Sequence, residues 1–317
     1  STVDRIDYLN DTTTAVEKGP LSVVRYYHGA TGNKNFGYFG GGGSPALSSV
    51  DRIDYSSDTA TAVVKGPLTS TKYRTTATGN QNFGYFFGTS PVTTTLDRID
   101  YSNDTATAVE KGPLSLARFN LAATGNADSG YFGGGAVPGG GPFSTVDRID
   151  YSSDTSTAVA KGPLSGTRYG LGATGNSDFG YFGGGFPGPG ILSTIDRVDY
   201  SNDTGTISTK GPLSHYRYLV DASSARANGF VPIGSSVVSN ADAVAGSFNP
   251  TTFGYFGGGT YPGSYSTVDR IDYSNDTADA SPKGPLSAGG EQLAATGNSF
   301  FGYFGGRQSP TRSIVDR

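Results

Sequence analysis

The chain has 317 residues, a net charge of −4, no cysteine and no methionine, and only 16% of its residues are charged. The lack of cysteine excludes disulfides and thiolate metal sites, the lack of a basic field argues against a nucleic-acid partner, and no apolar run is long enough for membrane insertion. Glycine is abundant, but 20 Tyr and 18 Phe recur at regular places, which is typical of a folded β protein and not of a disordered chain.

One unit, FGYFGGG followed by STVDRIDYSNDTATAVEKGPLS, recurs six times with small changes. Each DRID core, which is DRVD in the fifth copy, begins with an aspartate. Successive copies lie 46 to 50 residues apart, except that the last two are 73 apart. A period of this size indicates a repeat architecture. The first aspartates of the cores are Asp4, Asp51, Asp97, Asp147, Asp196 and Asp269.

Each copy predicts four short strands, which we name c, d, a and b in chain order. Strand c is the STVDRIDY stretch, and a YSND turn connects it to strand d, the TATAVxK stretch. KGPL ends strand d, because proline cannot donate a ladder hydrogen bond. Strand a follows a basic residue, as in 118–123, and a Gly-Asn turn connects it to strand b, FGYFGG.

The pattern resembles the kelch repeat of β-propellers, with a glycine doublet after an apolar strand, a V-x-x-x-D strand, and a basic residue opening strand a. The resemblance covers essentially the whole chain and implies an all-β, six-bladed propeller with four antiparallel strands per blade. Two departures are small residues such as Ala60 and Ala106 where kelch repeats hold a strand d aromatic, and Phe87-Gly88 in place of the doublet. We expect strand b aromatics, or the Tyr that ends DRIDY, to fill that volume. The amino-acid sequence of the repeats also resembles proteins of marine tailed phages.

The order of elements predicts how the ring closes. The chain begins with strands c and d in residues 1–21 and ends with strands a and b in residues 291–306, so these should pair in one blade and remove open sheet edges. We therefore expect a single domain, 1–317. The fifth copy carries an insert at about 221–249, and 313–317 is the surplus start of a further repeat. With no initial methionine or signal peptide, we expect a segment or processed form of a longer product.

The alternating strand directions place the a–b and c–d turns on one face, and the b–c and d–a loops on the other. The first face is nearly the same in every copy, whereas the second varies, so we expect a partner on the second face. Basic residues followed by aromatics recur in the d–a loops and could hold a sugar or carboxylate. The alternative is that each basic residue ties blades together through an aspartate of DRID. The candidate partner-binding residues are Arg25, Tyr27, His28, Lys72, Arg118, Arg168, Tyr216 and Arg217.

Other recurring polar groups favour structural roles. The six DYSND turns could offer oxygens to Ca²⁺, but Asx turns explain them as well. The six KGP lysines predict a solvated ring rather than an anion site. Only His28 and His215 supply imidazoles, and only three glutamates are present, Glu17, Glu110 and Glu291. We therefore predict no catalytic, cofactor or metal site.

These observations predict a non-enzymatic structural or recognition propeller of a virion fibre, tail or other extracellular assembly. Its partner would be a surface glycan or protein subunits of the assembly, bound through loops of one face. Two alternatives remain open, a polysaccharide-acting propeller enzyme and a subunit of an extracellular filament. The sequence does not name the ligand, the host or the oligomeric state.

Overall fold

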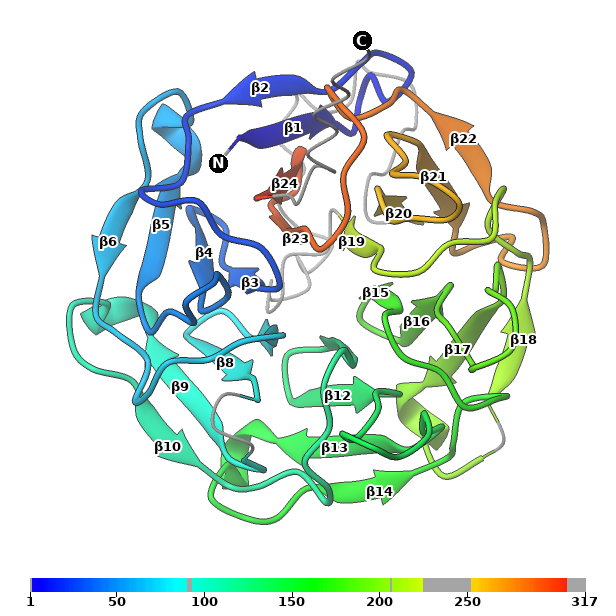
Figure 1. Ribbon diagram of the computed structural model, residues 1–317, viewed down its shortest axis with the longest axis horizontal. Coiled ribbons are helices and arrows are strands. Elements are labelled where there is room, and N and C mark those ends of the chain that lie inside the picture. Colours follow the sequence, from blue (N-terminus) through cyan, green and yellow to red (C-terminus); the bar gives the residue numbers. More distant parts are fainter. Residues whose placement is uncertain (1, 90–92, 206, 225–251, 307–317) are drawn as a thin grey trace, which may run out of the picture.

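A computed structural model describes residues 2–89, 93–205, 207–224 and 252–306. Their strands form six four-stranded antiparallel sheets, arranged as blades around a central axis, which confirms the predicted six-bladed β-propeller (Figure 1). Most of the insert expected at about 221–249, and all of the expected surplus segment 313–317, lie outside the described residues. No helix within the described ranges has the length and hydropathy needed to cross a lipid bilayer.

The inner two strands of each blade are strands a and b. The a strands are β3 (Gly29–Gly32), β7 (Thr76–Gly79), β11 (Ala122–Gly125), β15 (Gly172–Gly175), β19 (Asp221–Ser224) and β23 (Ala294–Gly297). The b strands are β4 (Phe36–Gly40), β8 (Phe83–Phe87), β12 (Ser129–Gly133), β16 (Phe179–Gly183), β20 (Phe253–Gly257) and β24 (Phe301–Gly305).

The outer two strands are c and d. The c strands are β1 (Val3–Asp7), β5 (Val50–Asp54), β9 (Leu96–Asp100), β13 (Val146–Asp150), β17 (Ile195–Asp199) and β21 (Val268–Asp272). The d strands are β2 (Val16–Lys18), β6 (Val63–Lys65), β10 (Val109–Lys111), β14 (Val159–Lys161), β18 (Ser208–Lys210) and β22 (Ser281–Lys283). We number the blades 1 (β3–β6), 2 (β7–β10), 3 (β11–β14), 4 (β15–β18), 5 (β19–β22) and 6 (β23, β24, β1 and β2).

The closing blade is built from both ends of the described chain, as predicted. Strand β1 pairs antiparallel with β24, with Val3 opposite Gly305 and Asp7 opposite Phe301. Strand β2 continues the sheet outward and β23 continues it inward. Pairing sequence-distant strands in one sheet closes the ring without an open edge between first and last blades.

The turns after the c strands are Asx-capped, which confirms the Asx-turn interpretation. In blade 1 the Asp54 carboxylate accepts a hydrogen bond from the backbone N–H of Ser56 and begins a 3₁₀ turn. The same cap recurs in other blades. The 3₁₀ turns are η1 (Tyr55–Ser57), η2 (Tyr101–Asn103), η3 (Tyr151–Ser153) and η4 (Tyr200–Asn202).

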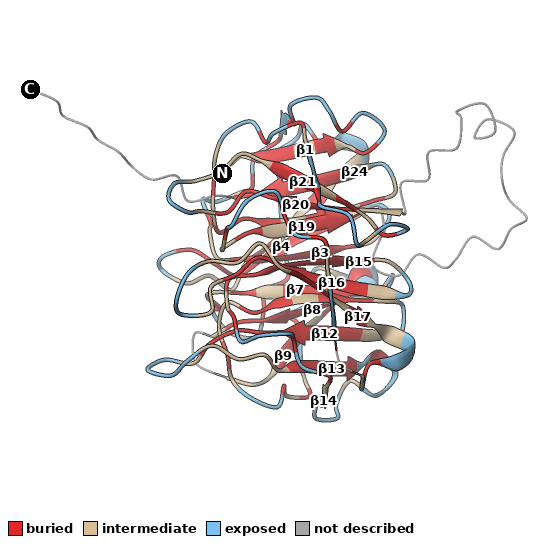
Figure 2. Cartoon of the chain, turned by 90° about the vertical axis from the view of Figure 1, so that its right-hand side faces the viewer, coloured by how far each residue is buried: buried red, intermediate tan, exposed pale blue. Residues whose placement is uncertain are grey.

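Many residues of the b and c strands are buried (Figure 2), and their side chains form clusters between neighbouring blades, where the core lies. Tyr38 on β4 of blade 1 stacks on Tyr101 of blade 2, with ring centroids 4.7 Å apart. Equivalent stacks join the other neighbouring blades, at 4.7–4.8 Å. These rings fill much of the interface volume, as aromatic pairs do in protein cores.

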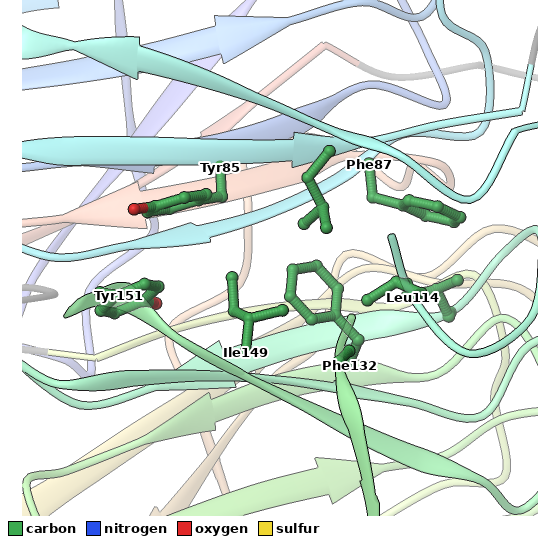
Figure 3. Close-up of a cluster of buried hydrophobic side chains, with 9 residues drawn as sticks. Tyr85, Phe87, Leu114, Phe132, Ile149 and Tyr151 are labelled. Carbon is green, nitrogen blue, oxygen red and sulfur yellow. The ribbon is translucent and has the colours of Figure 1, made fainter. Parts of the chain in front are cut away.

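In the second copy, an aromatic residue stands where the other copies have the first glycine of the doublet, and it contacts a ring of the next blade. In blade 1, Gly40 lies against the Phe86 ring of blade 2, so closely that an added Cβ would be 2.7 Å from a ring carbon. In blade 2 the corresponding residue is Phe87, which contacts Phe132 of blade 3 edge-on at 6.5 Å (Figure 3). Leu114 packs in the same cluster.

The small residues noted in strand d do not mark an aromatic vacancy, so this expectation is wrong. Ala60 and Ala106 are exposed in the c–d turn, before strand d begins. Glycine of KGP explains the close packing there, because a Cβ at Gly66 would lie 1.9 Å from the carbonyl oxygen of Ala106. The buried alanines are instead two residues later, at Ala62 and Ala108.

One carboxylate clamps each pair of neighbouring blades. Asp104, in the c–d turn of blade 2, accepts a hydrogen bond from the Tyr38 hydroxyl at 3.0 Å and binds Arg52 at 2.7 Å and Lys65 at 3.1 Å, all from blade 1. Burial raises the pKa of Asp104, but these three donors outweigh it and hold the pKa below its usual value. The expected solvated ring of KGP lysines is therefore wrong, because each of them pairs across a blade boundary. The six clamp acids are Asp11, Asp58, Asp104, Asp154, Asp203 and Asp276.

Removing one clamp acid should loosen one boundary of the ring. Asp154→Ala leaves Arg98, Lys111 and the Tyr85 hydroxyl without their shared acceptor, at a partly buried site. We expect a loss of about 3 kcal/mol in the free energy of unfolding, measured by urea titration. Asp178→Ala, at an exposed turn, is the control and should change the free energy by less than about 0.5 kcal/mol. Equal effects of the two substitutions would refute the clamp.

Candidate binding site at the mouth of the central channel

The six a strands line a central channel. Its described lining is made mostly of Gly, Ala, Thr and Leu, and it encloses a volume of about 980 Å³ including the space at its open ends. Only two charged side chains belong to this described lining, Arg74 and Asp221. One end of the channel opens on the face that carries the d–a and b–c loops, which we call the collar face. The other opens among the a–b and c–d turns, on the turn face.

The basic residues of the d–a loops lie inside the blades, and not on the surface where a partner could reach them. The Arg118 guanidinium binds Asp147 of strand c at 2.8 Å and donates to the carbonyl oxygens of Gly134 and Thr145. The tie is thus to an aspartate of DRID, as in the alternative interpretation, but it lies within one blade and does not bridge two. The five buried residues are Arg25, Lys72, Arg118, Arg168 and Arg217, each at most 1% exposed.

Two residues after each of the five basic positions, and after Gly290 in the sixth copy, the backbone adopts a left-handed conformation, with φ between 52° and 66°. These six residues occupy equivalent places at the collar-face end of the channel, yet no two are alike. They are Tyr27, Arg74, Asn120, Gly170, Leu219 and Gln292.

Backbone hydrogen bonds join this left-handed column from blade to blade. The N–H of Tyr27 donates to the carbonyl oxygen of Gln292 at 3.2 Å, and Gly170 donates to Asn120 at 2.7 Å. Further bonds link Gln292 to Leu219, Leu219 to Gly170, and Thr75 to Tyr27. Among the described residues, no such bond joins Asn120 to Arg74, so the chain of bonds has one seam, between blades 2 and 3.

Half-exposed aromatic rings surround this end of the channel, and we call them the aromatic collar. Five of them directly follow the buried basic residues, where sequence reasoning left open whether they would be buried. Ring contacts at 5.1–6.4 Å connect neighbours around the mouth. In blade 6 the corresponding residue is Glu291, so the collar has one acidic gap. The collar consists of Tyr26, Tyr27, Tyr73, Phe119, Tyr169, Phe186 and Tyr218.

The other candidate residues from the sequence, Tyr27, His28 and Tyr216, differ in how exposed they are. Tyr27 is a collar residue, and burial raises its pKa to about 12, so its hydroxyl stays protonated. His28 is 2% exposed, packs near the Phe39 ring and has a pKa held well below its usual value, mainly by burial. Tyr216 is 64% exposed on the collar face. Of the eight candidates, Tyr27 and Tyr216 therefore remain open to a partner.

Two carboxyl groups lie near the channel. Asp221, on β19, replaces the small residues that other a strands carry there, and burial raises its pKa to about 7, against hydrogen bonds from the backbone N–H groups of Ala222 and Ala295. Burial also raises the pKa of Glu291, while a hydrogen bond with Thr260 opposes the shift. Asp221 is therefore a group that titrates near neutral pH.

Sequence reasoning missed Arg74 and Asp221 as site residues. When the six repeats are aligned, one position holds a different residue type in every copy, and this variation could have pointed to Arg74. The position is at residues 27, 74, 120, 170, 219 and 292. The position two residues earlier, which is basic in five of the six copies, is instead structural.

The pKa of Asp221 predicts a pH dependence of stability. The folded pKa, about 7, lies above the unfolded value near 3.8, so the native state gains stability from this group below pH 4 and loses it as the pH rises to 7. Asp221→Ala, which places an alanine as in Ala122 and Ala294, should leave the midpoint of thermal unfolding nearly unchanged at pH 4 and raise it at pH 8. A larger gain at pH 4 than at pH 8 would contradict the assignment.

Comparisons with known proteins identify the fold and not the function. No protein-family model matches the chain, and no curated protein matches it in sequence. Solved structures do match, among them the structure of YjhT, with a TM-score of 0.66 over 88% of this chain and 89% of that one, at 11% sequence identity. At this identity the match supports the propeller architecture alone.

Proposed function

We propose that this protein is a non-enzymatic recognition propeller that binds a glycan at the collar face, at the mouth of its central channel. The observation that carries the proposal is where the six copies differ. Their framework residues repeat almost without change, while the left-handed column presents six different residue types around one opening. A rigid scaffold that displays variable side chains at loops is the usual arrangement of a binding site.

The aromatic collar favours a glycan over other partners. Half-exposed Tyr and Phe rings offer flat apolar surface together with hydroxyl groups, which suits ligands that are apolar on one face and polar at the edge. The backbone N–H groups of Tyr27, Gly170, Leu219 and Gln292 are used in the blade-to-blade bonds. Few main-chain donors are therefore left at the mouth for a peptide that would add as a strand.

The repeat pattern supports a proposed family relationship and a proposed biological setting. A kelch-type relationship rests on the glycine doublets, the V-x-x-x-D strands and the six-bladed architecture. A virion fibre, a tail or another extracellular assembly is the proposed setting, in line with the resemblance to phage proteins and with surface glycans as partners. A filament subunit is a weaker proposal, because its argument rests on residues 313–317, outside the described part of the chain.

A polysaccharide-acting enzyme is the second candidate, and Asp221 is the observation that favours it. A carboxyl group with a pKa near 7 inside a channel has the property required of a general acid. Glycoside cleavage uses two carboxyl groups, and Glu291 is a second carboxyl group near this channel whose pKa is raised. Sugar release that disappears in Asp221→Asn would favour the enzyme over the binding module.

Tryptophan reporters can test which face binds. The chain contains no tryptophan, so Tyr169→Trp places one fluorophore in the collar, and Phe300→Trp places one at an exposed site, 54% accessible, in an a–b turn. We expect neutral or acidic hexasaccharides to change the emission of the collar reporter in a saturable way, because ligand contact alters the polarity around the indole.

Phe300→Trp is the matched control and should not respond. If the reporter at the turn face responds and the collar reporter does not, the collar face is wrong. If neither reporter responds to any hexasaccharide of the panel, glycan recognition by this propeller is wrong. Measuring the unfolding midpoints of both variants confirms that each is folded during the titration.

A further inference from the structure

We infer that the collar takes a saccharide that carries a carboxylate, and that Arg74 is the residue that selects the carboxylate. The inference rests on the proposed function and specifies the class of glycan. It places the acidic group of the sugar at the seam between blades 2 and 3, with the sugar ring against the aromatic collar.

Arg74 differs from every other arginine in the described part of the chain. The other ten each have a carboxylate partner within 4.0 Å, whereas Arg74 has none there. Its Nε is buried and, among the described residues, has no hydrogen-bond acceptor. A guanidinium without an anion is costly when partly buried and is a ready partner for a planar carboxylate, which it can bind with two parallel hydrogen bonds.

The surrounding rings hold the Arg74 side chain at the mouth. Its guanidinium carbon lies 4.3 Å from the ring centroid of Phe119 and 5.6 Å from those of Tyr27 and Tyr73. Contacts of this kind between a cation and aromatic faces orient the guanidinium without neutralising its charge. The positive charge therefore stays available to a ligand that reaches the collar.

The seam in the backbone bonds lies beside Arg74. Asn120 uses its carbonyl oxygen to accept from Gly170, but its own N–H has no acceptor among the described residues. Each of the other left-handed residues outside blade 2, from Gly170 to Tyr27, donates to the preceding blade. The Asn120 N–H and the Arg74 Nε–H are thus two donors at this seam that have no acceptor among the described residues.

The opposite side of the mouth suits hydroxyl groups. Gln292 is 8% exposed, lines the channel, and its Oε1 has no hydrogen-bond donor in the described structure. This buried acceptor fits a sugar hydroxyl and does not fit a carboxylate. Glu291 lies on the same side, so a ligand with several negative charges would be repelled there. The mouth is therefore polarised toward a ligand with one carboxylate at one end and hydroxyls at the other.

The test compares an acid with its neutral ester. Glucuronosyl-glucose, a disaccharide with a single carboxylate, and its methyl ester differ in charge but hardly in shape, and isothermal titration measures the dissociation constant of each. We expect the parent protein to bind the acid about ten-fold more tightly than the ester, the range of a charge-assisted pair. Arg74→Gln should bind both within about two-fold of each other. Glutamine already occupies the equivalent left-handed position at Gln292, so the variant is compatible with the backbone.

Two further variants keep the result interpretable. Arg74→Lys retains the charge but not the planar guanidinium, and should keep part of the preference for the acid. Asn120→Gln changes a neighbouring residue of the mouth without changing charge, and should keep the preference. A preference that survives in Arg74→Gln, or that disappears in Asn120→Gln alone, overturns the assignment to Arg74.

The outcomes separate this inference from the proposed function. If the Tyr169→Trp collar reporter responds equally to the acid and the ester, the proposed glycan site stands and selection of a carboxylate is wrong. If only Phe300→Trp responds, both are wrong. Tighter binding of triglutamate than of glucuronosyl-glucose at the collar would make the ligand an acidic peptide and overturn the saccharide. Tighter binding of a sulfated disaccharide would overturn the carboxylate.

Discussion

The propeller depends on a carboxylate shared across each blade boundary. A blade buries its two faces only against its neighbours, so six sheets must meet at nearly the same angle for the ring to close. Asp104 shows how this is achieved, since it collects a tyrosine, an arginine and a lysine of the preceding blade at 2.7–3.1 Å. The stacked tyrosines beside each clamp, 4.7–4.8 Å apart, and the KGP glycines that admit a neighbouring carbonyl set the separation. Asp11 completes the ring between blades 5 and 6.

A second set of ion pairs, within the blades, supports the candidate site. Each buried basic residue fixes its d–a loop to strand c, as Arg118 does through Asp147. The next residue, Phe119, is then held half exposed at the mouth, and Asn120 adopts the left-handed conformation that begins the descent into the channel. Within three consecutive residues, the first is therefore buried and structural, and the next two face the mouth of the channel. This explains how a nearly invariant repeat can present a mouth with a different chemical group from every blade.

Much of the architecture could be predicted from the repeats. The period, the strand order within a copy and the offset between the two ends led to six blades and to pairing of β1 with β24, and the structure has both. Turn chemistry was also readable, because an Asx cap depends on residues only two positions apart, such as Asp54 and Ser56. These features are local or are repeated six times, so the sequence states them redundantly.

The sequence by itself determined the repeat, the blade count, the closure and the face on which the copies differ. Only the tertiary structure decided which polar residues are accessible. Arg25 and Arg74 are both basic residues beside tyrosines in the same kind of loop. Arg25 is buried against Asp51, 26 positions further along, whereas Arg74 lies at the channel mouth and has no carboxylate partner among the described residues. Asp221 likewise has a raised pKa because it is buried in the lining of the channel, a position that its neighbours in sequence do not reveal. Burial and charge pairing depend on contacts between distant segments, and a sequence motif does not contain the distances that set them.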